Sequence, residues 1–480
     1  MKYATAGEPG WQSLRMRRKN FNSLLAMLFR LRRLWQPLRE SLWLVPLLMV
    51  LASLGLAYGL IQYDQATSAT GTHELPLLFG IDASGAGGML ISISGSMLTV
   101  AALTFSLLLT AIAQVSNQYS PRALRNFMRD PVNQFTMGYF VSVFTFGLVV
   151  QGTIRSGRAD KFVPTTAVLV GLLLALGGVG ALIFFIHHIA ESLQTGTLVR
   201  RIMAETEREL RRLFPLNLGQ ELHPAARPAA EAYVAAPEGW VAVPAPEAGY
   251  LQYLDAPGLL AWTIRHRTVL RLEVHIGDFV GTGQRLLSVR AGMERAAPAQ
   301  ADWPQDLLRY VGLGPHRNPT QDVAFGVQQL VDIALKALSP AVNDTTTAIM
   351  AIDYLGELVG RLARRDFPGA LRSDGQHLRV LVRVYGFTDY LHLAFDLVRQ
   401  SASGNPAVLR RLLRALALAA SQVRDPARLP ALRQQVQLLL AAAQRTLPTD
   451  YERQAVQAVY DELCAPWMGD APSAPALPLS

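Results

Sequence analysis

Lysine and cysteine are nearly absent from this sequence, and charged residues of both signs are scarce. Cys464 is the single cysteine among 480 residues, which excludes a disulfide within the chain and a metal site built from several cysteines. Charged residues make up 17% of the chain and hydrophobic residues 50%. This balance predicts a membrane part joined to a soluble part.

Recognisable catalytic motifs are also missing. The sequence contains no Walker loop, dinucleotide-binding glycine motif, zinc-protease helix, nucleophile elbow or EF-hand loop. We therefore expect no enzymatic activity, no cofactor and no bound metal. An enzyme acting on lipid or envelope material would need a catalytic cluster that the sequence does not display.

Four apolar stretches are long enough to cross a membrane, which takes about 20 residues of helix. They cover residues 42–61, 89–115, 135–154 and 164–189, and none has a charged residue in its interior. Proton relays and ion-coupled carriers use ionisable groups at such positions, so the pattern argues against an active transporter and leaves a passive channel open.

The distribution of arginine predicts the orientation of these spans. Nine basic residues precede the first span, and all but Lys2 form one block: Arg15, Arg17, Arg18, Lys19, Arg30, Arg32, Arg33 and Arg39. Residues 62–88 contain no Lys or Arg, whereas residues 116–133 contain three arginines. By the positive-inside rule, both termini are cytoplasmic and the protein is a multi-pass protein of a bacterial inner membrane. The basic block is expected to contact membrane lipid and not nucleic acid.

We predict a membrane α-helical domain followed by a cytoplasmic α+β region, in which a small β domain precedes a helical domain. The expected boundaries are 1–41 for the basic segment, 42–190 for about four transmembrane helices, 191–231 for a connecting helix and linker, 232–292 for the β domain, 302–464 for the mainly helical domain and 465–480 for a disordered tail.

The second span carries polar side chains at helical spacing. They are Ser92, Ser96, Thr99, Ser106, Thr110, Gln114 and Asn117. A polar face within hydrocarbon must meet protein or water, so it is either a packing seam between helices or the wall of an aqueous path. Taken alone, the pattern favours the seam. Small residues in the third span, Gly138, Ser142 and Thr145, and in the fourth, Gly171, Ala175 and Gly178, predict close helix contacts.

Three arginines follow the second span at spacings of three and four. Arg122, Arg125 and Arg129 should share one face of a helix at the inner membrane surface. Contact with anionic headgroups is favoured over the mouth of an anion path. His187 and His188, at the inner end of the fourth span, are expected to reach headgroups and water and not to bind a metal.

The β segment contains four predicted strands and one glycine-rich turn. The strands begin at Trp240, Tyr250, Thr268 and Arg285, and the turn starts at Gly277. This turn resembles that of the lipoyl and biotinyl carrier domains. The segment has no lysine to which such a cofactor could be attached, so we expect an unmodified structural or interaction module.

Apolar periodicity predicts helices over residues 322–338, 346–362, 407–423, 429–443 and 451–463, with one strand within 378–385. Two polar stretches there are candidate ligand sites: one holds Arg317, Gln321 and Asp322, and the other holds Asn343 and Asp344. Each opens a helix, where free N–H groups favour an anion. Ordinary helix capping by Thr320, and by Asp344 or Thr345, is the favoured interpretation.

Several motifs in both halves resemble a family of predicted bacterial integral membrane proteins, domain of unknown function 2254. The resemblance rests on Thr104-Phe-Ser-Leu, on residues 118–130, on the run from Gln321 to Ala334, and on Leu338-Ser-Pro-Ala-Val-Asn-Asp-Thr-Thr-Thr-Ala. The family pattern has a proline after Asn-Asp, where this chain has Thr345. The resemblance implies the membrane topology and no chemical activity.

Two functional interpretations follow. The first is a homo-oligomeric channel or passive transport protein, with the second spans lining the path and the cytoplasmic region assembling or gating it. Several copies are needed, because four helices make a poor pore. The second is a membrane-anchored sensor or scaffold without transport activity. We favour the first, because the polar face continues into an arginine-bearing segment. The sequence identifies neither a small-molecule nor an ion ligand.

Overall fold

A computed structural model describes residues 43–68, 83–118, 130–157, 160–213, 218–293, 303–402 and 404–469. The chain divides near residue 194 into two compact units, called here the membrane unit and the C-terminal unit. The basic N-terminal block and Arg122, Arg125 and Arg129 lie outside the described residues, so the predictions made for them stay predictions.

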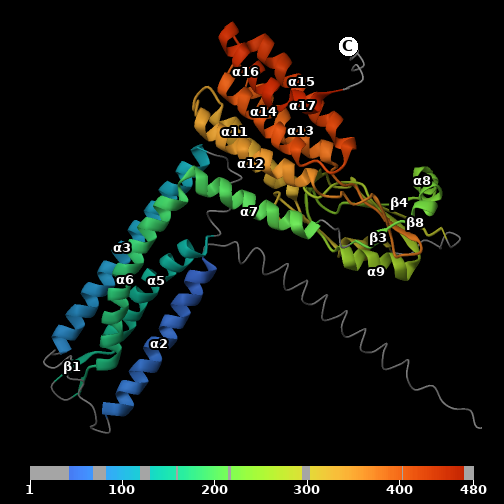
Figure 1. Cartoon of the computed structure of the whole chain (residues 1–480). Helices are drawn as coiled ribbons and strands as arrows, with labels where there is room; N and C mark the ends of the chain where they lie inside the picture. The colour runs from blue at the N-terminus through green and yellow to red at the C-terminus, as the bar shows by residue number, and fades with distance from the viewer. Residues whose placement is uncertain are drawn as a thin grey trace, which may run out of the picture. The chain divides into compact units, whose positions relative to one another are not determined.

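The membrane unit consists of four helices long and apolar enough to cross a membrane (Figure 1). They are α2 (Leu44–Ser68), α3 (Ala83–Gln118), α5 (Pro131–Gln151) and α6 (Thr165–Ser192). A short hairpin of β1 (Arg155–Gly157) and β2 (Asp160–Phe162) connects α5 to α6. The four predicted spans are therefore confirmed. Helices α2 and α3 run past their apolar stretches, because helical hydrogen bonding continues through neighbouring polar residues.

The predicted close contacts between small residues are present in the membrane unit. A Cβ atom added to Gly171 would lie 3.2 Å from Leu90 Cδ2, and one added to Gly178 would lie 3.1 Å from Met97 Sδ. On α5, a Cβ at Gly138 would lie 3.0 Å from the Pro46 Cα atom of α2. Gly138 lets α5 approach the backbone of α2, and Gly171 and Gly178 of α6 make room for the Leu90 and Met97 side chains of α3.

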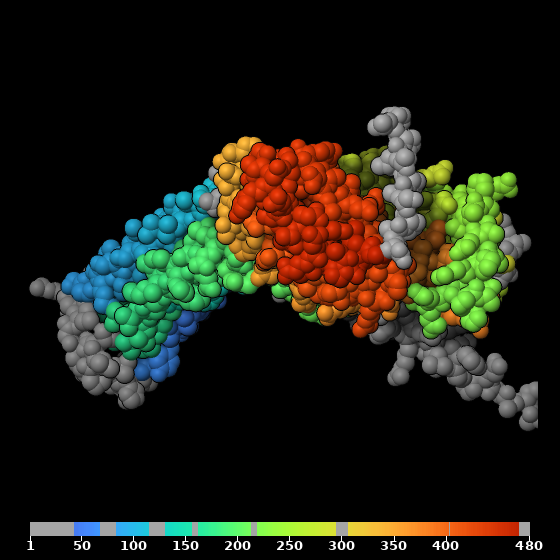
Figure 2. All heavy atoms as spheres, turned by 45° about the horizontal axis from the view of Figure 1, so that its top comes forward, coloured from blue at the N-terminus to red at the C-terminus, as the bar shows by residue number. Residues whose placement is uncertain are grey.

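The C-terminal unit begins with α7 (Thr195–Leu213), which packs against α11 (Val323–Ala337) and α12 (Thr345–Ala363). Helices α13 (Phe387–Ser401), α14 (Pro406–Ser421), α15 (Leu429–Thr446) and α16 (Asp450–Leu463) complete the helical part, whose surface is orange to red in Figure 2. Helix α13 was not among the predicted helices, although Phe387, Leu391 and Val398 follow a helical period and are buried. Residues 465–468, predicted to be disordered, form the short helix α17 (Ala465–Met468).

Two sheets form the β part. The larger has the strand order β3 (Gln220–Glu221), β10 (Leu371–Ser373), β11 (Leu378–Leu381), β6 (Thr268–Leu272), β8 (Arg285–Ala291) and β4 (Val241–Pro244). The smaller consists of β7 (Phe279–Val280), β5 (Gly249–Leu254) and β9 (Val311–Gly314). The four predicted strands are present. The segment 232–292 does not form its sheets alone, however, because β9, β10 and β11 come from later in the chain.

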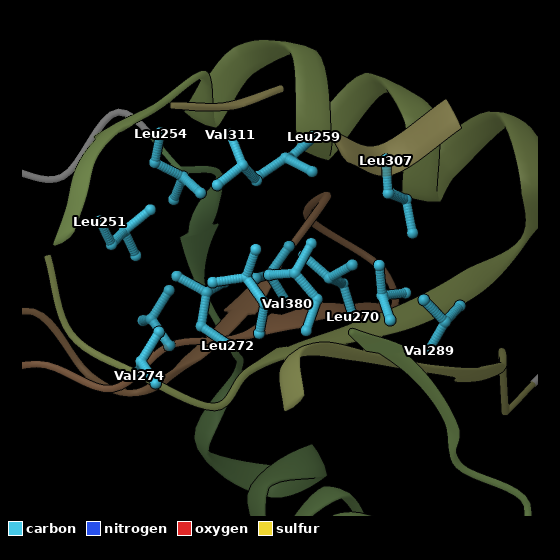
Figure 3. Close-up of a cluster of buried hydrophobic side chains, with 14 of the residues drawn as sticks. Leu251, Leu254, Leu259, Leu270, Leu272, Val274, Val289, Leu307, Val311 and Val380 are labelled. Atoms are coloured by element: carbon cyan, nitrogen blue, oxygen red, sulfur yellow. The ribbon is translucent and has the colours of Figure 1, made fainter. Parts of the chain in front are cut away.

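Short helices cover the β part: α8 (Arg227–Ala235), preceded by a 3-10 turn at Pro224–Ala226, α9 (Ala256–His266) and α10 (Trp303–Leu308). A second 3-10 turn, Pro426–Arg428, connects α14 to α15 in the helical part. Leu259 of α9 and Leu307 of α10 join Leu270, Val289 and Val380 of the large sheet in one buried apolar cluster (Figure 3). This core holds β6 and β11 side by side. They pair in parallel, with Val380 opposite Leu270.

Candidate functional sites on α3 and at the sheet edge

The polar face of α3 points away from the other helices of the membrane unit. Ser92, Ser96, Thr99, Ser106, Thr110 and Gln114 are all exposed; the side chain of Asn117 lies outside the described residues. The opposite face is buried and includes Leu90, Met97, Leu108 and Ala111. A seam between the polar face and the chain's own helices is therefore excluded among the described residues.

The hydroxyl groups of this polar face donate to carbonyls of their own helix. Ser92 Oγ donates to Gly88 O, Thr99 Oγ1 to Gly95 O and Thr110 Oγ1 to Ser106 O, each at 2.9 Å. No atom of the described chain lies within 4 Å of a Cβ added to Gly88 or Gly95. The face is therefore uncovered and largely polar, interrupted by the exposed Leu103, with lone pairs of its hydroxyl oxygens still available as acceptors.

A second site forms where Arg317 meets the start of α11. Arg317 Nε and Nη2 each donate to one oxygen of the Asp322 carboxylate at 2.9 Å. Asp322 also accepts from Phe325 N at 2.8 Å and so caps α11. Asp322 is 4% exposed, and burial raises the pKa of its carboxyl to about 6, although Arg317 opposes the shift.

The expected capping by Thr320 is wrong, because the cap is Asp322. This also weakens the case for an external anion at this helix start, since the carboxylate of Asp322 accepts from Phe325 N and already places a negative charge there. Gln321 stands at a positive φ of 60° and pairs with Leu254 of β5. Arg317, Gln321 and Asp322 of the first polar stretch thus lie together, in the loop that attaches the start of α11 to β5.

The other polar stretch lies at the far end of α11. Asp344 accepts from Thr347 N at 3.0 Å and caps α12, as the capping interpretation expected. Asn343 adopts the left-handed conformation with φ of 49°. The 15 residues of α11 separate the two stretches, a length of about 22 Å. Thr345 is the first residue of α12, where proline is well tolerated, and its hydroxyl accepts from Asn405 Nδ2.

His188 does not simply reach water, as had been expected. Its Nε2 lies 3.2 Å from Oδ2 of Asp130, the residue that caps α5, while His187 is exposed. Within the described ranges, no group of three or more His, Cys, Asp or Glu side chains could hold a metal ion. The pair is best understood as a contact between α5 and α6.

The parallel pairing of β6 and β11 assembles a site that the sequence did not reveal. The segments that follow the two strands meet at one sheet edge, where the His275 and Tyr385 rings lie 4.6 Å apart. Arg383 Nη1 donates to Glu273 O at 2.8 Å, which joins the same two segments. Ligands often bind at the carboxyl edge of parallel strands. No local sequence pattern predicts this site, because β11, the strand that pairs with β6, lies over 100 residues further along the chain.

This sheet edge lies next to Arg317. A Cβ added to Gly277, which has φ of 93°, would lie 2.8 Å from Arg317 Nη2. The rings of Tyr385 and Tyr390 lie tilted to each other with their centroids 5.5 Å apart, and burial raises the pKa of both hydroxyls. On the outer side is an open pocket of about 610 Å³, with Arg285, Arg383 and Phe279 among its lining residues. Polar groups and an aromatic ring therefore converge there.

Comparison with known proteins places the chain in a family. Residues 39–418 match the family model described as "Predicted membrane protein (DUF2254)". Uncharacterized proteins of Mycobacterium tuberculosis and Mycobacterium bovis are 34% identical over 439 residues, which cover 90% of this chain and 81% of each relative. No solved structure gives a significant match. The chain thus belongs to the DUF2254 family of predicted membrane proteins.

Proposed function

We propose that several copies of this protein assemble in a bacterial inner membrane and that the α3 helices line a passive path for a solute. The observation that carries the proposal is the outward direction of the α3 polar face, opposite the buried residues Leu90, Met97 and Leu108. In this arrangement the C-terminal unit is cytoplasmic, in agreement with the arginine-rich N-terminus, and it assembles or gates the path.

Energetics favours covering this face. A polar face turned to lipid is unfavourable, and small residues allow another helix to come close. From Ser92 to Gln114 the face runs over 23 residues of continuous helix, about 33 Å, which matches the ~30 Å hydrocarbon core. Self-association around α3 would therefore cover the polar face through the full thickness of the membrane.

A membrane-anchored sensor or scaffold is the second candidate. One observation favours it: the hydroxyls of Ser92, Thr99 and Thr110 already donate to their own helix, so the face does not need water. In that case the polar face is a dry seam between copies or with another membrane protein. The two candidates differ in whether water reaches the middle of α3.

Cysteine accessibility distinguishes them. Cys464 is buried, and burial raises the pKa of its thiol to about 11, so its replacement by alanine removes a slow background signal. Single cysteines are then placed at Ser96, Ser106 and Thr110 in membranes and treated with a membrane-impermeant thiol reagent. Leu98 and Leu109, exposed on other faces of α3, serve as lipid-facing controls, and Leu108 as the buried control.

Labelling at Ser96, Ser106 and Thr110 but not at the controls is the result expected for an aqueous path. Uniform protection of all six positions would overturn the path and leave the sensor or scaffold. Oxidative crosslinking of the same cysteines tests assembly separately, because a disulfide between two Ser96→Cys chains requires the α3 helices of two copies to meet. If none of the cysteines on the polar face of α3 forms a crosslink, self-association through this face is contradicted.

A further inference from the structure

The pocket at the carboxyl edge of β6 and β11 contains two guanidinium groups without a carboxylate partner. Arg285 and Arg383 are both exposed, and neither has a salt bridge to any described residue. One N–H of Arg383 donates to Glu273 O, whereas the side chain of Arg285 makes no hydrogen bond to any described residue. Both therefore keep most of their donors for a ligand.

Each of the two carboxylates of the pocket has one oxygen that is engaged by neighbouring groups. Glu273 Oε1 accepts from Arg271 Nε at 2.7 Å and from Ser288 Oγ. Asp278 Oδ2 accepts from His275 N at 2.9 Å and lies 3.1 Å from His275 Nδ1. The two arginines and the two carboxylates of the pocket cancel in formal charge, and the charged donors that remain available to a ligand are those of Arg285 and Arg383.

An aromatic ring stands beside these cations. Phe279 is 58% exposed, and the edge-on ring of Tyr250, at a centroid distance of 5.3 Å, fixes its position from one side. The position of Phe279 follows from β7, whose neighbour Val280 is fully buried in the core and pairs with Gly249. Phe279 thus lines the pocket as an exposed ring on an anchored strand, which keeps it from collapsing into the core.

We infer that this pocket binds a nucleotide, with phosphate oxygens on Arg285 and Arg383 and the base against Phe279. Guanidinium groups match phosphate in geometry and charge. Bases stack on aromatic side chains regardless of base identity. Inorganic phosphate would use the arginines alone, so the role of Phe279 separates the two kinds of ligand. The inference does not depend on a path through the membrane, because binding is measured on purified protein.

The test is calorimetric titration of the detergent-solubilised full-length protein with ATP, tripolyphosphate and adenosine. The wild type should bind ATP saturably and more tightly than either part of it. Arg285→Ala should weaken ATP binding about tenfold or more, as expected for loss of a charge-assisted hydrogen bond. Arg445→Ala, an exposed arginine on α15, is the matched control and should bind as the wild type does.

Phe279→Ala distinguishes the nucleotide from a bare phosphate group. It should weaken ATP binding roughly tenfold while leaving tripolyphosphate binding unchanged. Arg285 makes no contact that the fold needs, so the thermal unfolding of Arg285→Ala should equal that of the wild type. Absence of ATP binding at millimolar concentration, or unchanged binding in both variants, would overturn the inference. Equal binding of ATP and tripolyphosphate would assign the site to phosphate alone.

Discussion

The side chain of Gln321 pairs with the backbone of Leu254 as a neighbouring β-strand would. Gln321 Nε2 donates to Leu254 O at 3.2 Å, and Leu254 N donates to Gln321 Oε1 at 3.0 Å. Gln321 reaches this position from a backbone with φ of 60°, next to the buried Asp322. The loop before α11 is therefore attached to the end of β5 by one side chain.

Replacing Gln321 by alanine should destabilise the C-terminal unit. Two hydrogen bonds are lost, which costs about 1–3 kcal/mol, while alanine keeps the backbone strain that glutamine already bears at positive φ. Gln321→Gly removes the same hydrogen bonds without the strain, so it should be less destabilising than Gln321→Ala. Thermal or urea unfolding measures both. Equal unfolding free energies for the wild type and Gln321→Ala would show that the pairing contributes nothing.

Asp322 should make stability depend on pH. Its pKa is raised from 3.8 to about 6 by burial, so the folded state binds the proton more tightly than the unfolded state. The resulting stabilisation is fully present below pH 3.8 and is lost as the pH rises through about 6. Between pH 7 and pH 5, the wild type should therefore gain stability relative to Asp322→Asn, which cannot titrate.

Measurement of unfolding free energy at several pH values for both proteins tests this. The difference between them cancels the titration of the other groups. A difference that stays constant from pH 7 to pH 5 would mean that Arg317, whose guanidinium binds both carboxylate oxygens, keeps Asp322 ionised throughout.

Glycines of the membrane unit should fall into two classes on replacement by leucine. Gly171→Leu meets Leu90 and Phe146 and should disturb the fold of a single copy, at a cost of about 1–3 kcal/mol or more. Gly95→Leu meets no atom of the described chain, so the fold should be kept. If α3 faces another copy, Gly95→Leu should nevertheless abolish assembly.

Size-exclusion chromatography with light scattering, together with thermal unfolding, separates these effects. Gly180 on α6 also has no atom within 4 Å of an added Cβ, so Gly180→Leu is the matched control. Loss of assembly in Gly95→Leu but not in Gly180→Leu is expected. The same oligomer in the wild type, Gly95→Leu and Gly180→Leu would count against an interface at α3.

Asp64 should stabilise the membrane unit by capping a helix that is distant in sequence. Its carboxylate accepts from Thr166 N at 3.3 Å and from Ala167 N at 3.1 Å, at the start of α6, and Asp64 is 6% exposed. Asp64→Ala should lower stability by about 1–2 kcal/mol. Heat unfolding in detergent measures it, with the exposed neighbour Gln65→Ala as the control. Equal losses in both variants would contradict the cap.

Local patterns in the sequence determined the elements of this protein. Four uncharged apolar stretches are enough to predict α2, α3, α5 and α6, because hydrocarbon thickness sets one length for every span. Alternation and helical periodicity likewise predicted β4, β5, β6 and β8 and five of the C-terminal helices. The polar face of α3 was also readable, since a period of 3.6 residues is a local property.

Tertiary structure decided where those elements face and which residues meet. Periodicity shows that α3 has a polar side, but it does not show whether that side contacts α5 and α6 or lies outside. The packing of Leu90 and Met97 against α5 and α6 places the polar side outside. The meeting of His275 with Tyr385 depends on β6 pairing with β11 across more than 100 residues. Such pairings are set by burial of a shared core, and no local spacing records them.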